Sequence, residues 1–139
     1  MIEHEIGFYK RGYKYQLIQS CSYAVTGFPD VPVSQFELNL FVFIESQVLF
    51  IRSGYCWDGP SGPVRDGNKL MRASLVHDAL YQLMRERSLP DTERDKADRL
   101  FQQMLVEDGV SKLRAWVYYR GLKAFGKRAA TKQRKVYEL

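Results

Sequence analysis

Apolar positions in the first 55 residues follow the pattern of β-strands. Residues 13–23 are rich in β-branched and aromatic side chains and alternate in part between apolar and polar, as half-buried strands do. Two further apolar segments, 36–44 and 48–51, flank the short polar connection 45–47, a spacing that is typical of a β-hairpin. The pattern therefore predicts three or four antiparallel strands in this half.

From residue 70 onward the apolar positions recur with the period of a helix. The first predicted helix runs from Leu70 to about Arg87. A second helix begins after Pro90, and it stops at Gly109 because glycine commonly follows a helix end. A third helix is predicted over 112–127. The change of period divides the chain into a strand-rich half and a helical half.

One α+β domain accounts for this order of elements. A chain of 139 residues is long enough to bury a core of its own. N-terminal antiparallel strands come first and three α-helices follow, and the first two helices are predicted to pack as an antiparallel pair because their connection is short. The predicted organisation of residues 1–139 is mainly strands over 1–55, a Gly/Pro loop over 56–69, helices over 70–126 and a basic tail over 127–139.

Composition narrows the class of protein. The chain is 45% hydrophobic and 27% charged, which is ordinary for a globular protein. No segment approaches the ~18 uncharged apolar residues of a membrane-spanning helix, so we expect no such helix. The N-terminus lacks the apolar core of a secretory signal peptide, so we expect no signal peptide either. Cys21 and Cys56 are too few for a disulfide framework. The two could pair with each other, but the reduced state is the expected one.

The net charge of +5 is unevenly distributed. Residues 1–108 carry −3, whereas residues 109–139 carry +8. A basic end on a slightly acidic body is typical of proteins that meet an anionic partner. Three interpretations of residues 112–135 stay open: contact with an anionic membrane surface, contact with nucleic acid, or a helix whose aromatic side chains pack on the sheet while its charges stay in water.

Polar residues on the first two predicted helices suggest a functional site. Taking 100° per residue, His77 and Tyr81 lie at the edge of the apolar arc of the first helix, whereas Asp78 and Arg85 lie toward the polar surface. On the second helix, Asp98 falls among apolar residues, an unusual place for an unpaired carboxylate. The antiparallel pairing would bring these interior polar side chains together.

A histidine facing a carboxylate is the arrangement of a general base and its orienting partner. Asp98 would fix the tautomer of His77, and the other ring nitrogen would take a proton from water or a hydroxyl. Tyr81, one turn after His77, could donate to the same carboxylate. The alternative is a buried His–Asp–Tyr network that only satisfies its own hydrogen bonds.

Asp78 suggests a second, metal-binding element. Calcium takes several oxygen ligands, commonly carboxylates together with backbone carbonyls of a tight loop. The Gly/Pro loop that follows Trp57 could supply such carbonyls, and Asp58 a second carboxylate. The sequence therefore raises calcium as a candidate cofactor.

Three motifs in this order resemble the active site of phospholipase A2 in its disulfide-poor form, as in parvovirus capsid proteins. The matching residues are Trp57-Asp-Gly59-Pro-Ser61, His77-Asp78-Ala-Leu-Tyr81 and Ala97-Asp98-Arg-Leu-Phe101. The resemblance implies that His77 activates water, that Asp98 is its partner and that Asp78 binds calcium. It also implies metal-binding carbonyls near Trp57, Gly59 and Ser61. Ser61 departs from the pattern by replacing a glycine, and the strand-rich first half does not belong to that enzyme fold.

The same motifs, with Ala73 to Tyr81 and Ser61-x-Pro63, resemble DUF1353, a phage-associated family of unknown function. This resemblance implies a phage or prophage protein of similar size that opens with strands. It implies location in the host cytoplasm or the virion. The expected partners are phospholipid or an anionic membrane surface and other phage structural proteins.

The chain lacks the residues that several enzyme classes need. With only His4 and His77, the chain cannot build the histidine-rich metal site of His-Asp phosphohydrolases, and no zinc-ligand spacing is present. No Gly-x-Ser-x-Gly or phosphate-binding glycine loop occurs. Three hypotheses remain: a phospholipase-A2-like hydrolase, a non-enzymatic virion, tail or assembly component, and a basic nucleic-acid or membrane-surface binder. A serine hydrolase that uses Ser61 with His77 ranks below the version in which His77 activates water.

Overall fold

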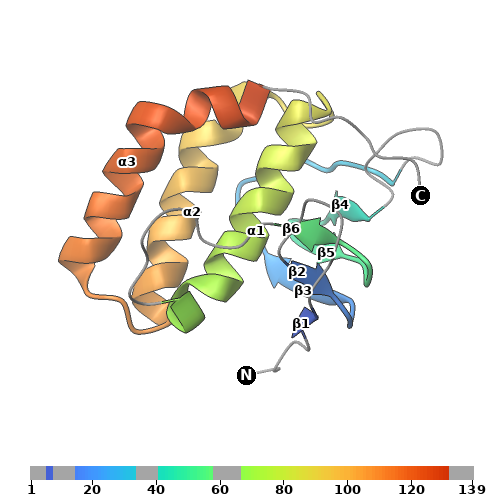
Figure 1. Cartoon of the computed structure of the whole chain (residues 1–139). Helices are drawn as coiled ribbons and strands as arrows, with labels where there is room; N and C mark the ends of the chain where they lie inside the picture. The colour runs from blue at the N-terminus through green and yellow to red at the C-terminus, as the bar shows by residue number, and fades with distance from the viewer. Residues whose placement is uncertain (1–5, 8–14, 34–40, 58–66, 132–139) are drawn as a thin grey trace.

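The computed structural model describes residues 6–7, 15–33, 41–57 and 67–131. Helices stand side by side on one side of the molecule, and short strands gather on the other (Figure 1). Buried apolar side chains from the strands and the helices form one hydrophobic core, so both halves of the chain contribute to it. The predicted α+β fold, strands first and helices after, is confirmed.

Within the described residues, the strands form two antiparallel three-stranded sheets, ordered β1-β2-β6 and β3-β5-β4. Their bounds are β1 Ile6–Gly7, β2 Tyr15–Leu17, β3 Cys21–Ala24, β4 Val42–Glu45, β5 Val48–Ile51 and β6 Cys56–Trp57. The two sheets are linked through the backbone: the N–H of Leu17 donates to Tyr55 O at 2.7 Å, and the N–H of Gly54 donates to Leu17 O at 2.6 Å. These hydrogen bonds join β2 to the segment between β5 and β6, which connects the two sheets.

The predicted hairpin is present as β4 and β5. Ser46 and Gln47 make the turn with φ of 50° and 60°, the left-handed conformation that two-residue hairpin turns require. The N–H of Ser46 donates to Asp30 Oδ1 at 3.0 Å, which ties the turn to a neighbouring loop. The predicted strand 13–23 is instead two strands, and the part of the other predicted strand before residue 41 lies outside the described residues.

The helices lie close to their predicted positions. Their bounds are α1 Gly67–Arg85, the 3-10 turn η2 Asp91–Glu93, α2 Arg94–Glu107 and α3 Lys112–Thr131. Gly109 ends α2 as expected: its φ is 97°, and the N–H of Val110 reaches back to Leu105 O at 2.9 Å, as in a Schellman motif. None of the helices in the described ranges is long and apolar enough to cross a membrane.

α1 and α2 are antiparallel neighbours, as predicted. Near the start of α1, Arg72 forms ion pairs at 2.9 Å with Glu107 and Asp108 at the end of α2. Further along, Tyr81 of α1 meets Asp98, which lies earlier in α2. The hydrogen bonds from Arg72 hold the pKa of Glu107 below its ordinary value. The start of α1 therefore lies beside the end of α2, which makes the two helices antiparallel.

One expectation about a side chain was wrong, and one of the three open interpretations of α3 does not hold. Arg85 was expected toward solvent, but it is buried, with 7% exposure. The reason is that α1 packs between the strands and the other helices (Figure 1), so a wider arc of its surface is covered than the apolar arc alone indicates. The aromatic side chains of α3 were one candidate for packing on the sheet, but α3 packs on α2 and α1, and Trp116 is half exposed.

Candidate functional site

A histidine, a carboxylate and a tyrosine meet between α1 and α2. Nε2 of His77 lies 2.8 Å from Asp98 Oδ1, and the Tyr81 hydroxyl donates to the same oxygen at 2.5 Å. All three are buried, with exposures of 7% for His77, 3% for Tyr81 and 1% for Asp98. The hydrogen bonds predicted for these side chains are confirmed.

The spacing of residues on the two helices explains why these side chains meet. His77 and Tyr81 stand four residues apart on α1, so they share one face, and their rings lie 4.0 Å apart between centroids. Phe101 of α2, 5.0 Å from the His77 ring, closes the apolar side of the network. The imidazole is thus fixed by packing on two sides and by a hydrogen bond on a third.

Arg94 compensates the charge of the buried carboxylate. Its Nη1 lies 3.9 Å from Asp98 Oδ2 and also donates to the carbonyl of Leu122 on α3 at 3.2 Å. A buried carboxylate is costly unless it is paired and hydrogen-bonded. Arg94 was not predicted as part of the site, although it stands one turn before Asp98 on the same helix.

Gly126 lets α3 approach the network closely. A Cβ added at this glycine would lie 2.6 Å from the Tyr81 hydroxyl and 3.4 Å from Arg94 Nη1. Burial, followed by the hydrogen bond to Asp98, raises the pKa of Tyr81 well above its ordinary value, so the phenol keeps its proton. Gly126 therefore marks the point where a third helix closes the site.

We expect Gly126→Ala to destabilise the protein by about 1–3 kcal/mol, because the added methyl group must displace a phenol held by packing and a hydrogen bond. Gly121→Ala is the matched control, since a Cβ there has no described atom within 4 Å. Alanine has the higher helix propensity by about 1 kcal/mol, so this control should be neutral or stabilising. Urea denaturation of both variants measures the difference. Equal effects at the two glycines would contradict the close contact.

The start of the Gly/Pro loop is anchored beside the site. Trp57 is fully buried, and its Nε1 donates to Ser74 Oγ on α1 at 3.3 Å. Ser74 lies one turn before His77, so strand β6 delivers the chain to the helix that carries the histidine. The other loop residues of the predicted metal site, Asp58, Gly59 and Ser61, lie outside the described residues.

Of the predicted metal ligands, the structure describes only Asp78 and Trp57. Asp78 is partly buried and follows His77 directly on α1. Across the described ranges, no three histidine, cysteine, aspartate or glutamate side chains gather to hold a metal ion. Calcium binding therefore stays a prediction.

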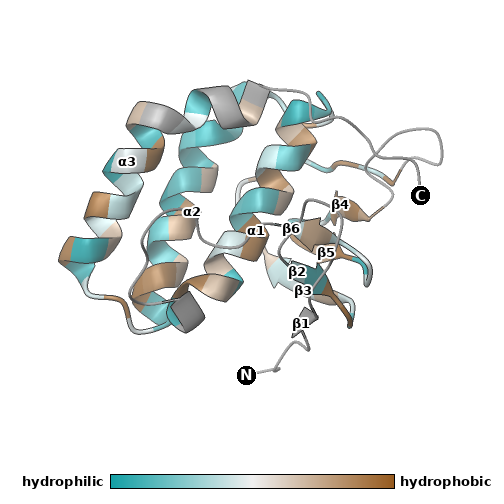
Figure 2. Ribbon diagram, in the orientation of Figure 1, coloured by the Kyte–Doolittle hydropathy of each residue, from teal (hydrophilic) through white to brown (hydrophobic). Residues whose placement is uncertain are grey.

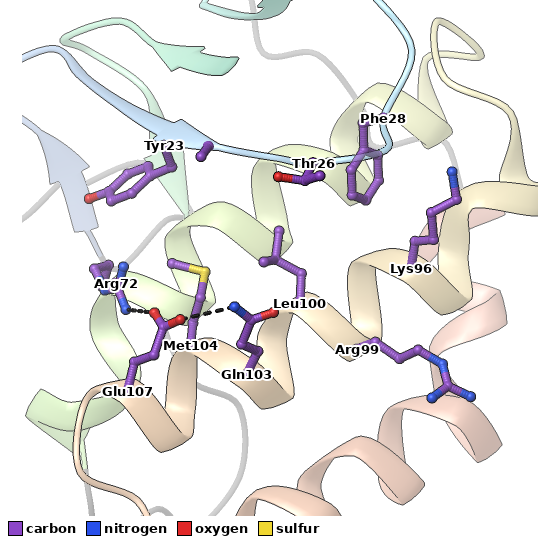
Figure 3. Close-up of a pocket in the computed structure, with 11 residues that line it drawn as sticks. Tyr23, Thr26, Phe28, Arg72, Lys96, Arg99, Leu100, Gln103, Met104 and Glu107 are labelled. Carbon is purple, nitrogen blue, oxygen red and sulfur yellow. Dashed lines mark hydrogen bonds and ion pairs between the residues drawn. The ribbon is translucent and has the colours of Figure 1, made fainter. Parts of the chain in front are cut away.

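A separate cavity of about 370 Å³ lies between strand β3 and α2 (Figure 3). Several of its α2 side chains, such as Gln103 and Glu107, point roughly 140–180° away from Asp98 around the helix axis. The hollow is thus on the other face of α2 from the His–Asp–Tyr network, and it contains none of the predicted site residues. Its lining is Tyr23, Ala24, Thr26, Phe28, Arg72, Lys96, Arg99, Leu100, Gln103, Met104 and Glu107.

Fold and site together define an α+β protein with a buried His–carboxylate–Tyr network on an antiparallel helix pair. Residues 41–122 match the family described as "Protein of unknown function (DUF1353)", and the chain belongs to this family. The matched segment contains strands β4, β5 and β6, the helix pair and α3 as far as Leu122. No curated protein and no solved structure matches the chain.

Proposed function

We propose that the protein is a hydrolase in which His77, oriented by Asp98, activates water for attack on an ester. The observation that carries this proposal is the hydrogen bond of 2.8 Å between His77 Nε2 and Asp98 Oδ1. With Nε2 facing the carboxylate, Nδ1 is the nitrogen that takes the proton. Tyr81 and Arg94 hold the carboxylate in place, which is the support that a base-orienting group needs.

The reaction balances with water as the only co-reactant. Water oxygen bonds to the ester carbonyl carbon while its proton moves to Nδ1 of His77. The bond from that carbon to the alcohol oxygen then breaks, and His77 returns the proton to the departing alcohol. The products are a carboxylic acid and an alcohol. The order of the three motifs, which resembles phospholipase A2, favours a phospholipid ester in a phage-associated setting, with calcium at Asp78 as part of the same proposal.

The test is release of fatty acid from mixed micelles of phosphatidylcholine and phosphatidylglycerol by the intact protein. Parallel assays contain calcium or a chelator, and a soluble nitrophenyl ester serves as a second substrate. Activity should be present in the wild type and absent from His77→Gln purified in the same way, which excludes a contaminating enzyme. Activity that requires calcium in the wild type and is lost, or needs much more calcium, in Asp78→Asn would assign the metal to Asp78. Failure to hydrolyse either substrate in either buffer would overturn the proposal.

A structural role for the same network is the second candidate. It is favoured by the burial of Asp98 and Tyr81, whose exposures of 1% and 3% leave little surface for a substrate. In this case the protein is a non-enzymatic virion, tail or assembly component. Substitutions in the network would then lower stability in a protein that hydrolyses nothing.

A further inference from the structure

The outward side of α3 exposes three large apolar residues within five positions. Leu113 is 71% exposed, Trp116 51% and Val117 56%. Their spacing of three and four places them on one side of the helix, whereas Ala115 and Tyr119 on the opposite side are buried. Single exposed apolar residues are ordinary, but a contiguous group marks an interaction surface. Figure 2 shows apolar segments interrupting the hydrophilic colour along α3.

Basic side chains flank this apolar group, and more of them follow on the same side of the helix. Lys112 and Arg114 lie on its two flanks, and Arg120, Lys123 and Lys127 continue the same side for two more turns. All five are exposed, and residues 112–131 contain no aspartate or glutamate. We call these five residues, together with Leu113, Trp116 and Val117, the α3 surface.

We propose that the α3 surface docks onto an anionic lipid bilayer, with the helix lying in the plane of the interface. Its positive charge is complementary to anionic headgroups, and a basic helix with exposed tryptophan and leucine is suited to this position. The Arg120 guanidinium lies 5.8 Å from the centre of the Trp116 ring, so a cation and an interfacial aromatic side chain share one site.

The composition of the α3 surface favours lipid over other anionic partners. Lysine is depleted at protein–protein interfaces, but on a membrane its long apolar stem lies along the interface while the ammonium reaches the headgroups. Nucleic acid is bound through basic and aromatic side chains, which would leave the aliphatic Leu113 and Val117 in water. A bilayer accommodates the basic, the aromatic and the aliphatic side chains together.

The proposal concerns binding, so it stands whether or not His77 is catalytic. The experiment is sedimentation of the intact protein with vesicles of three parts phosphatidylcholine to one part phosphatidylserine, and with vesicles of pure phosphatidylcholine. We expect Leu113→Ser with Trp116→Ser to weaken binding at least about tenfold, because the inserted apolar area is lost. Each basic residue strengthens binding about fivefold, so Arg120→Gln with Lys123→Gln should weaken it about twenty-fivefold. Ile18→Ser and Arg52→Gln, exposed changes on the strand side, are the matched controls and should have no effect.

Trp116 also reports the depth of docking. The chain has two tryptophans, and Trp57 is fully buried, so quenching by lipids brominated in the acyl chain should fall on Trp116. Equal binding to both vesicle types, loss of binding only with the charge variant, absence of quenching, or tighter binding to a DNA or RNA oligonucleotide than to the vesicles would each overturn the proposal. Thermal denaturation of each variant verifies that the fold is kept.

Discussion

Asp98→Ala is expected to lower the free energy of unfolding by about 3–5 kcal/mol, the cost of breaking a buried, charge-assisted network by removing one partner. The substitution leaves the buried Tyr81 hydroxyl without its acceptor, and it leaves Arg94, which is partly buried, without its counter-charge. Each buried group left unsatisfied costs about 1–3 kcal/mol. Since small domains are stable by only about 5–15 kcal/mol, a large part of the total would be lost.

Asp95 supplies a matched control on the same helix. It also accepts a tyrosine hydroxyl, from Tyr119 at 2.5 Å, and pairs with Arg99 at 2.7 Å, but it is exposed. These hydrogen bonds lower the pKa of Asp95 below its ordinary value. Because exposed pairs contribute only about 0–1 kcal/mol, Asp95→Ala should have a small effect. Urea denaturation at neutral pH measures both variants, and similar losses would show that burial does not determine the energy of the Asp98 network.

Asp98→Asn is expected to reduce hydrolysis about 10²- to 10⁴-fold while the protein remains folded. The amide keeps the size of the carboxylate, so packing around His77 is preserved. It removes the negative charge that would stabilise the protonated imidazole, and its NH₂ group can impose the wrong tautomer on the ring. The stability loss should be smaller than in Asp98→Ala, because the side-chain amide still offers an oxygen to the Tyr81 hydroxyl.

Initial rates with the phospholipid and nitrophenyl substrates measure this effect, and circular dichroism follows the fold. Asp95→Asn is the control, since Asp95 lies outside the network, and its rate should equal that of the wild type. A fully active Asp98→Asn variant would exclude Asp98 as the orienting partner. A rate loss that only parallels the unfolded fraction would favour the structural role.

The helix pair and its polar contacts were predictable because they depend on helical periodicity. Spacing placed His77 and Tyr81 on one face of α1, and the position of Asp98 among apolar residues indicated a partner across the interface. Arg94 was not predicted, because a long flexible side chain can reach several partners from the same position. Gly126 was not predicted either, because a close approach between helices distant in sequence leaves no local signal.

The strands were harder to predict than the helices. β1 and β6 contain two residues each, too few to show an alternating pattern. The segment 13–23 looked continuous, yet the bend between β2 and β3 directs the chain into a second sheet. Local pattern cannot show this bend, since the partner strands β5 and β6 that impose it come more than 20 residues later.

The closeness in sequence of the site's partners has a consequence for the order of folding. Asp98 is 17 residues from Tyr81 and 21 from His77, whereas the ladder between β2 and β6 joins Tyr15 to Trp57. Contacts between near neighbours in sequence close with less loss of chain entropy, and they form faster. We therefore expect the helical hairpin to nucleate around its polar centre while the strands are still unpaired, so that His77 meets Asp98 before the sheets are complete.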